Sequence, residues 1–155
     1  MSRVDEALLR LGIDLPPAPA PLAAYVPVRI VGELAFVAGQ VPIDAGRATV
    51  TGHVGADVSI EDAAAGCRRA AFQALSAIRD ALGSFDRLVG IAQVSVFVAS
   101  APGFTDQPKV ANGASEALVE VLGDGGRHAR IAVGVVELPL GAAVEVGVVA
   151  ILAPA

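Results

Sequence analysis

In some segments of this chain the apolar residues recur at helical spacing, and in others they alternate with polar residues as in a strand. The clearest of these segments is a helix. Ser59 lies directly before an apolar series that falls on one helical face and ends before Gly83. Ser59 and Asp62 have the spacing of a capping box, and Gly83 is a typical C-terminal stop. A second helix is expected over residues 108–122, because proline suits a first helical turn. The apolar series of the first helix consists of Ile60, Ala64, Cys67, Ala71, Leu75, Ile78 and Leu82.

Segments of strand length surround these two helices. The pattern predicts strands over residues 25–31, 34–38, 47–51, 89–99, 129–136 and 143–152. Gly32 forms a tight turn between the first two, and Pro27 makes the first an edge or irregular strand. The order β-β-β-α-β-α-β-β predicts an α+β domain with two layers, a mixed six-stranded sheet and two helices on one face. Such a domain leaves the other sheet face uncovered.

The N-terminal segment has its own character. Residues 4–11 form a short amphipathic helix that stops at Gly12, and four prolines between Pro16 and Pro21 make an extended arm. We expect one domain over residues 1–155, with the helix and arm in 1–21. The start is too polar for a signal peptide, and Glu137, Pro139 and Glu145 interrupt the apolar residues 131–152, which suit buried strands. We therefore expect a cytoplasmic protein without membrane contact.

Composition points to association with further copies of the chain. Of 155 residues, 54% are apolar and only 4% aromatic, and mean hydropathy is +0.64. Small Ala and Val side chains fill little core volume, so some apolar surface is expected to be buried between subunits. The net charge of −5 and the absence of a Lys or Arg run argue against a nucleic-acid partner.

Familiar catalytic motifs are missing, and two charged residues attract attention instead. There is no phosphate loop and no nucleophile elbow, and His53 and His128 have no partner at metal-ligand spacing, so we expect no metal and place both histidines in surface loops. Cys67, the single cysteine, lies on an apolar helix face as a core thiol. Arg130 and Glu145 stand inside strongly apolar strands. They are functional, or they face solvent on an edge strand, or they pair with each other.

Four segments resemble the reactive intermediate deaminase (Rid, or YjgF) family. They are FVAGQVP (36–42), VSVFV (94–98), NGASEA (112–117) and HARIAVGVVELPLGAAVEV (128–146). In this family an Ala-Arg pair opens a strand, a Leu-Pro pair ends it, and a glutamate follows in the last strand. Residues 129–130, 138–139 and Glu145 match that pattern. The resemblance runs from about Tyr25 to the C-terminus. The loop at 101–115 and the longer N-terminus indicate a divergent branch.

The resemblance implies a chorismate-mutase-like fold and a homotrimer with sites in the clefts between subunits. It implies hydrolysis of 2-imino or 2-enamino acids to 2-keto acids and ammonia, without a cofactor. Arg130 would hold the substrate carboxylate, and Glu145 would orient water, move a proton, or position Arg130 through an ion pair. Further substrate-binding positions are the backbone at Gly39, Tyr25 from the neighbouring chain, Asn112, and Phe104 as an apolar wall.

Two positions depart from the family pattern. Ala38 stands where active deaminases often have Ser, and Ala132 stands where many members have Cys. Both losses remove polar groups from the cleft, which favours an alternative reading as a trimer that binds or senses carboxylate metabolites without turnover. A ribonuclease, which the acidic charge disfavours, and a chaperone working through exposed apolar surface are the remaining alternatives.

Overall fold

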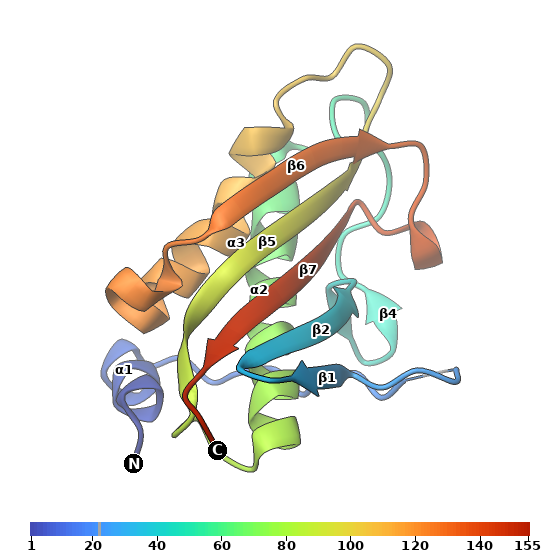
Figure 1. Ribbon diagram of the computed structural model, residues 1–155. Coiled ribbons are helices and arrows are strands. Elements are labelled where there is room, and N and C mark those ends of the chain that lie inside the picture. The colour runs from blue at the N-terminus through green and yellow to red at the C-terminus, as the bar shows by residue number, and fades with distance from the viewer. Residues whose placement is uncertain (22) are drawn as a thin grey trace.

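Residues 1–21 and 23–155 are described in a computed structural model of the protein (Figure 1). Within these residues three α-helices and seven strands follow one another, and both helices predicted for the body of the chain are confirmed. The elements are α1 Arg3–Leu11, β1 Val28–Val31, β2 Leu34–Gln40, β3 Ile43–Asp44, β4 Arg47–Ala48, α2 Ile60–Leu82, β5 Leu88–Ala99, α3 Gln107–Leu122, β6 Ala129–Val135 and β7 Val144–Leu152. Short 3-10 turns cover Gly123–Gly126 and Pro139–Gly141.

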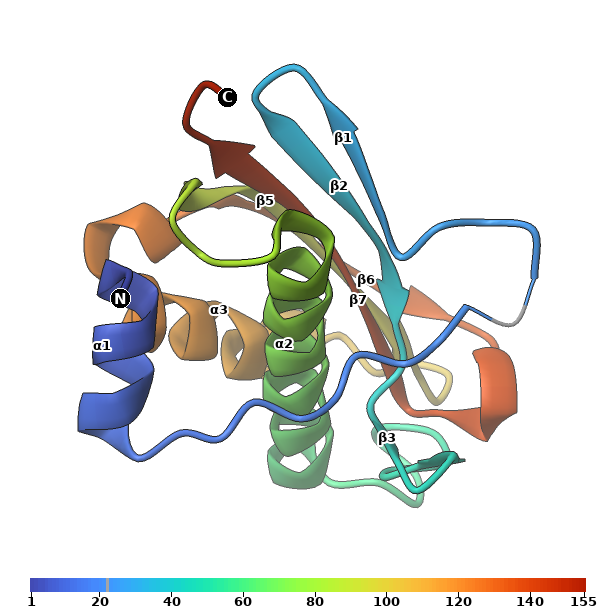
Figure 2. The ribbon, with the colours of Figure 1, turned by 90° about the horizontal axis from the view of Figure 1, so that it is seen from below.

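The main sheet is covered by helices on one face only. Its strand order is β1-β2-β7-β5-β6, with β5 and β6 parallel and all other pairs antiparallel. Helices α2 and α3 cover one face, and the opposite face carries no helix (Figures 1 and 2). Large apolar side chains remain exposed on this open face, among them Leu34, Phe36, Ile131 and Val133. The predicted two-layer α+β architecture with an uncovered sheet face is confirmed.

The predicted six-stranded sheet is wrong, because the main sheet has five strands. The third predicted strand, 47–51, contributes β4 to a separate two-stranded hairpin with β3. Ala45 and Gly46 both have positive φ, so the chain turns back on itself directly after β3. The end of this segment contacts the main body through an isolated bridge from Thr51 to Ala142, through a hydrogen bond from the Ala143 amide to the Val50 carbonyl, and through the Val50 side chain, which packs against the core.

Strand boundaries near the edge also differ from prediction. β1 starts at Val28, after Pro27, so Tyr25 lies in a bend outside the sheet. β2 continues through Gly39 to Gln40, with a register shift against β7 between Val37 and Gln40. This shift bends the strand at the position where β1 no longer covers it.

The core lies between the sheet and the two long helices. Ser59 accepts a hydrogen bond from the Asp62 amide, which caps α2 as the spacing predicts. Gly113 lets α3 approach the backbone of α2 at Ala64, where a side chain would collide with the Ala64 carbonyl group. Cys67 is fully buried, and this burial raises the pKa of its thiol to about 12. The prediction of an inert core thiol is thereby confirmed.

The N-terminal helix packs on the same core. Ser2 and Asp5 form a reciprocal capping box at its start, and Gly12 ends it in the left-handed conformation. Val4 and Leu8 are buried in the core cluster. The arm that follows crosses α2 on its way to β1 (Figure 2). Among the described helices, none combines the length and apolar character that a membrane crossing requires.

Candidate functional site

Arg130 is held against the first half of α3 by neutral groups. One terminal guanidinium nitrogen, Nη1, donates to Asn112 Oδ1 at 2.8 Å and to Ser115 Oγ at 3.2 Å. The other, Nη2, donates to the carbonyl of Pro108 at 3.3 Å, in the first turn of α3. That turn contains no acidic residue. No carboxylate of the described chain is within ion-pair distance of Arg130, so its positive charge remains available to an anion.

A histidine fixes the hydrogen bonds behind Arg130. His128 Nδ1 lies 2.6 Å from the Gly126 carbonyl, which can only accept, so Nδ1 carries the hydrogen. In the neutral ring Nε2 then accepts from the Ser115 hydroxyl at 2.9 Å. Ser115 Oγ is left to accept from Arg130. Ser115 and the neutral His128 ring therefore each donate one hydrogen bond and accept one, and this arrangement fixes the guanidinium in place.

Sequence reasoning missed these two partners. His128, expected in a surface loop, is half-buried against α3. Ser115 was not singled out, although it lies three residues after Asn112 and therefore on the same side of a helix. That spacing, together with the position of His128 two residues before Arg130, was the available sequence signal for these partners. His53 does lie at the surface, where bonds to the Val136 carbonyl and the Glu137 side chain raise its pKa.

Glu145 belongs to a second group of residues, around a cavity of about 250 Å³. Tyr25, Ala38 and Gly39 line this cavity with it. A side chain at Gly39 would overlap the Glu145 carboxyl group, so glycine is required for the carboxyl to lie against the backbone of β2. Glu145 is half-buried, and this burial raises the pKa of its carboxyl. The Ala38 amide already donates to the Pro27 carbonyl at 2.8 Å.

The two groups point away from opposite faces of the sheet. Arg130 is paired with Val94 of β5, whose side chain is fully buried beneath the helices. Glu145 is paired with Phe97, three residues further along β5. Side chains alternate along a strand and paired residues share a face, so Arg130 lies on the helix side and Glu145 on the open side. The hypothesis that they pair with each other within one chain is therefore wrong.

Ala132 and Phe104 complete the predicted set. Ala132 lies two residues beyond Arg130 on the same side of β6 and packs against the core. Phe104 is in neither group. Its ring lies against Gly55 and lines a separate hollow of about 450 Å³ with His53 and Val136. Within one chain, the structure thus joins Arg130, Asn112 and Ala132, and separately Glu145, Tyr25, Ala38 and Gly39.

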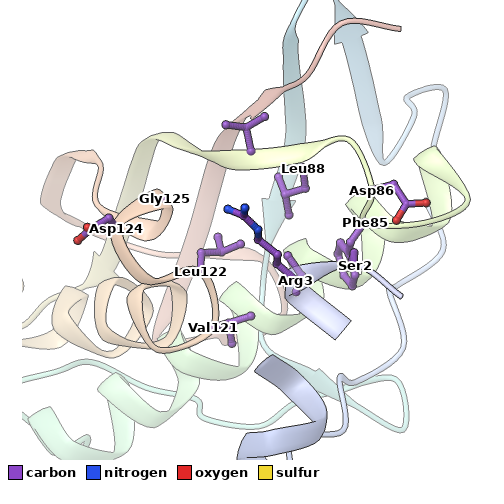
Figure 3. A pocket seen from close by; sticks show the side chains of 11 residues that line it. Ser2, Arg3, Phe85, Asp86, Leu88, Val121, Leu122, Asp124 and Gly125 are labelled. Carbon is purple, nitrogen blue, oxygen red and sulfur yellow. The ribbon is translucent and has the colours of Figure 1, made fainter. Parts of the chain in front are cut away.

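A larger cavity lies elsewhere in the described part of the chain and lacks such an arrangement (Figure 3). It measures about 510 Å³ and lies between the start of α1, the start of β5 and the end of α3. Arg3 reaches into it, with Asp86 and Asp124 on opposite sides. Asp86 bonds Ser84 and Asp124 pairs with exposed Arg127, so these polar groups do not converge. Within residues 1–21 and 23–155, no three His, Cys, Asp or Glu side chains cluster as metal ligands.

Comparisons with known proteins cover nearly the whole chain. Residues 5–152 match the family described as "YjgF/chorismate_mutase-like, putative endoribonuclease". Protein TCP17 of Trypanosoma cruzi is 46% identical over 145 residues, which cover 93% of this chain and 91% of that protein. The crystal structure of Atu1372 from Agrobacterium tumefaciens, of unknown function, is 39% identical, with a TM-score of 0.88 and coverage of 97% of this chain and 93% of that one.

The YjgF protein of E. coli shares the fold at greater distance. It is 27% identical, with a TM-score of 0.59 and coverage of 86% of this chain and 92% of that one. The higher TM-score of the Agrobacterium protein fits a divergent branch within one fold. Matched along almost its full length by the family and by relatives of this similarity, the chain belongs to the YjgF/chorismate mutase-like family.

Proposed function

We propose that this protein is an imine deaminase that hydrolyses 2-imino and 2-enamino acids to 2-keto acids and ammonia. The observation that carries the proposal is the state of Arg130, a cation fixed by Asn112, Ser115 and the Pro108 carbonyl but without a carboxylate partner. A planar guanidinium held this way can bind a carboxylate with two parallel hydrogen bonds. Holding the carboxylate orients the adjacent C=N carbon for attack.

The chemistry requires little beyond that orientation. Water adds to the imine carbon and one of its protons passes to nitrogen, which gives a carbinolamine. The second proton then moves from the hydroxyl group to nitrogen as the C–N bond breaks, so that ammonia leaves and the C=O bond of the keto acid forms. The imine is already electrophilic, so a covalent nucleophile is unnecessary. Glu145 would take the proton from water and return it to nitrogen, because burial has raised its pKa toward the range useful for a general base. The backbone at Gly39 lies beside this carboxyl, where it can contact the imine nitrogen.

A complete site on this proposal combines two copies of the chain. Gly39 lies on β2 and Glu145 beside it on the central strand β7, whereas Arg130 lies on the edge strand β6 and on the other face of the sheet. Bringing Arg130 of one copy to Glu145 of the next is a head-to-tail contact, and such contacts form a closed ring when their rotation closes. The family resemblance implies that this ring would be a trimer. The exposed apolar residues Leu34, Phe36, Ile131 and Val133 would then be covered at its centre.

A binding protein without turnover is the second candidate, and a specific observation favours it. Ala38 and Ala132 supply no polar side chain to either half of the site, so Arg130 can bind a carboxylate while water remains poorly oriented. RNA cleavage, which the family description mentions, receives less support. The net charge is −5, and five basic side chains pair with carboxylates, namely Arg68, Arg69, Arg79, Lys109 and Arg127.

The test is release of keto acid and ammonia from 2-imino acids generated in the assay by an amino-acid oxidase. Wild type is compared with Arg130→Ala and with Arg10→Ala, a control at an exposed arginine in the last turn of α1. The proposal predicts acceleration by wild type and the control, and its loss in Arg130→Ala. Acceleration that survives Arg130→Ala refutes the carboxylate clamp. Absence of acceleration with bound keto acid favours the binding protein.

A further inference from the structure

The proline-rich arm between α1 and β1 reaches the cavity at Glu145. After crossing α2 it loops out beside the β1–β2 hairpin (Figure 2). Pro19, Ala20 and Pro21 line the same cavity of about 250 Å³ as Gly39 and Glu145. A segment that precedes the four sequence segments quoted for the family resemblance therefore contributes a wall to half of the proposed site.

The arm is fixed at both ends. On the N-terminal side, the buried Ser76 hydroxyl of α2 donates to the Pro16 carbonyl at 2.5 Å, and Leu15 packs against the core. On the C-terminal side, the Pro27 carbonyl accepts from the Ala38 amide of β2 at 2.8 Å. These contacts hold the chain at two points and leave the stretch between them to span the cavity.

Stiffness of the spanning stretch comes from its prolines. A second cavity of about 310 Å³ is lined by Pro19–Pro21 together with Ala77 and Ala81 of α2, so these arm residues do not pack tightly onto the helix there. Proline fixes φ and favours an extended conformation without internal hydrogen bonds. The wall therefore keeps its position through backbone restraint, and glycine substitutions would release it without disturbing the core.

The wall offers a substrate only apolar contacts. Pro19, Ala20 and Pro21 have no side-chain hydrogen-bonding group, and Ile43 and Leu140 add further apolar side chains to the cavity lining. Among the described residues that line the cavity there is no Lys, Arg or His, and Glu145 supplies a carboxyl group. An anionic group entering here would meet a carboxylate and find no cation among the lining residues of its own subunit.

We infer that Pro19–Pro21 form the pocket for the substrate side chain and restrict this protein to 2-imino acids with short, uncharged, apolar side chains. The inference rests on the proposed function. It assigns the region beside Glu145 to the substrate's side chain, while Arg130 of a second copy holds the carboxylate. Selection then depends on the arm, which can be altered without touching either charged residue.

The experiment measures kcat/KM for imines generated from alanine, leucine and glutamate, using the full-length protein. Ala20→Leu fills the pocket and is expected to lower the leucine-to-alanine ratio at least about tenfold, the discrimination that a methylene or two brings in an apolar pocket. Pro19→Gly/Pro21→Gly loosens the wall and raises that ratio. Pro102→Gly, in an exposed loop away from this cavity, leaves it unchanged. In wild type, the glutamate-derived imine is the poorest substrate.

Failure of this inference is separable from failure of the proposed function. If wild type accelerates hydrolysis but all variants keep the same ratio, the arm is not the side-chain pocket and the deaminase stands. If wild type accelerates no imine, the deaminase fails, and dissociation constants are measured for pyruvate and 4-methyl-2-oxopentanoate. The arm inference still predicts that Ala20→Leu selectively weakens binding of the larger keto acid. An unchanged ratio, or no binding of either acid, overturns it.

Discussion

Substituting Gly113 by alanine tests whether close contact between α2 and α3 determines both stability and site geometry. In an exposed helix this change would stabilise the protein by about 1 kcal/mol, because alanine is the better helix former. Here the new Cβ would lie 2.6 Å from the carbonyl carbon of Ala64 and 2.9 Å from its Cα. These are backbone atoms of a neighbouring helix, which cannot rotate away as the end of a side chain can.

The expected net effect is therefore a loss of stability. Overpacking costs about 1–3 kcal/mol, and a backbone collision belongs at the upper end of that range. Subtracting the helix-propensity gain leaves about 2 kcal/mol of destabilisation. For a chain of this size that lowers Tm by about 4–8 °C. Relief of the collision also moves α3, which carries Asn112 and Ser115, so the clamp at Arg130 should weaken together with stability.

Thermal or chemical unfolding of Gly113→Ala measures this directly. The matched control is Glu116→Ala, an exposed position on the same helix that should change stability by no more than about 0.5 kcal/mol. Gly113→Ala that is at least as stable as wild type and keeps the wild-type kcat/KM would refute the close contact. A stable variant with reduced kcat/KM would instead show that α3 moves at little energetic cost.

Three further results are expected. Ser115→Ala removes the hydroxyl group and leaves the Arg130 guanidinium less restrained. KM for the imine should rise by about tenfold, equivalent to the loss of one charge-assisted hydrogen bond, while Tm changes little. An unchanged KM would contradict the positioning role of Ser115. Burial raises the Glu145 pKa above its ordinary 4.5, so the folded state favours the protonated carboxyl and the contribution of Glu145 to stability falls as pH rises through the raised pKa. Glu145→Gln should thus gain Tm over wild type at pH 8, and this gain should shrink toward pH 4.5; a constant difference would argue against burial as the cause. Cys67, buried with its thiol pKa near 12, should resist alkylation in the native protein at pH 8 and react on unfolding; rapid native labelling would contradict the core packing.

Local signals in the sequence were sufficient for the helices and for most of the sheet. Ser59, Gly83 and Pro108 mark helix ends through interactions within a few residues, and such interactions can be recognised without knowing the fold. The β3–β4 hairpin was misassigned because pairing partners are not local. Residues 47–51 have strand character, but only the turn at Ala45 and Gly46 decides which strand they join.

The candidate site shows the same division. Arg130 and Glu145 could be singled out because charged residues interrupt apolar strands. Their separation onto opposite sheet faces could not be predicted, because it depends on the register of β6 and β7 against β5. Ser115 and His128 escaped notice because neither is unusual in its own segment. They become partners only when α3 packs beside the start of β6.

The most direct test of a site shared between copies is complementation between two inactive variants. Arg130→Ala and Glu145→Ala are each purified, mixed at equal amounts, unfolded and refolded together, and assayed for imine hydrolysis. If Arg130 of one copy acts with Glu145 of the next, random ring assembly restores about a quarter of the sites, although both parents are inactive. Such recovery would confirm the account. A mixture as inactive as its parents, with mixed oligomers demonstrated by mass spectrometry, would contradict it.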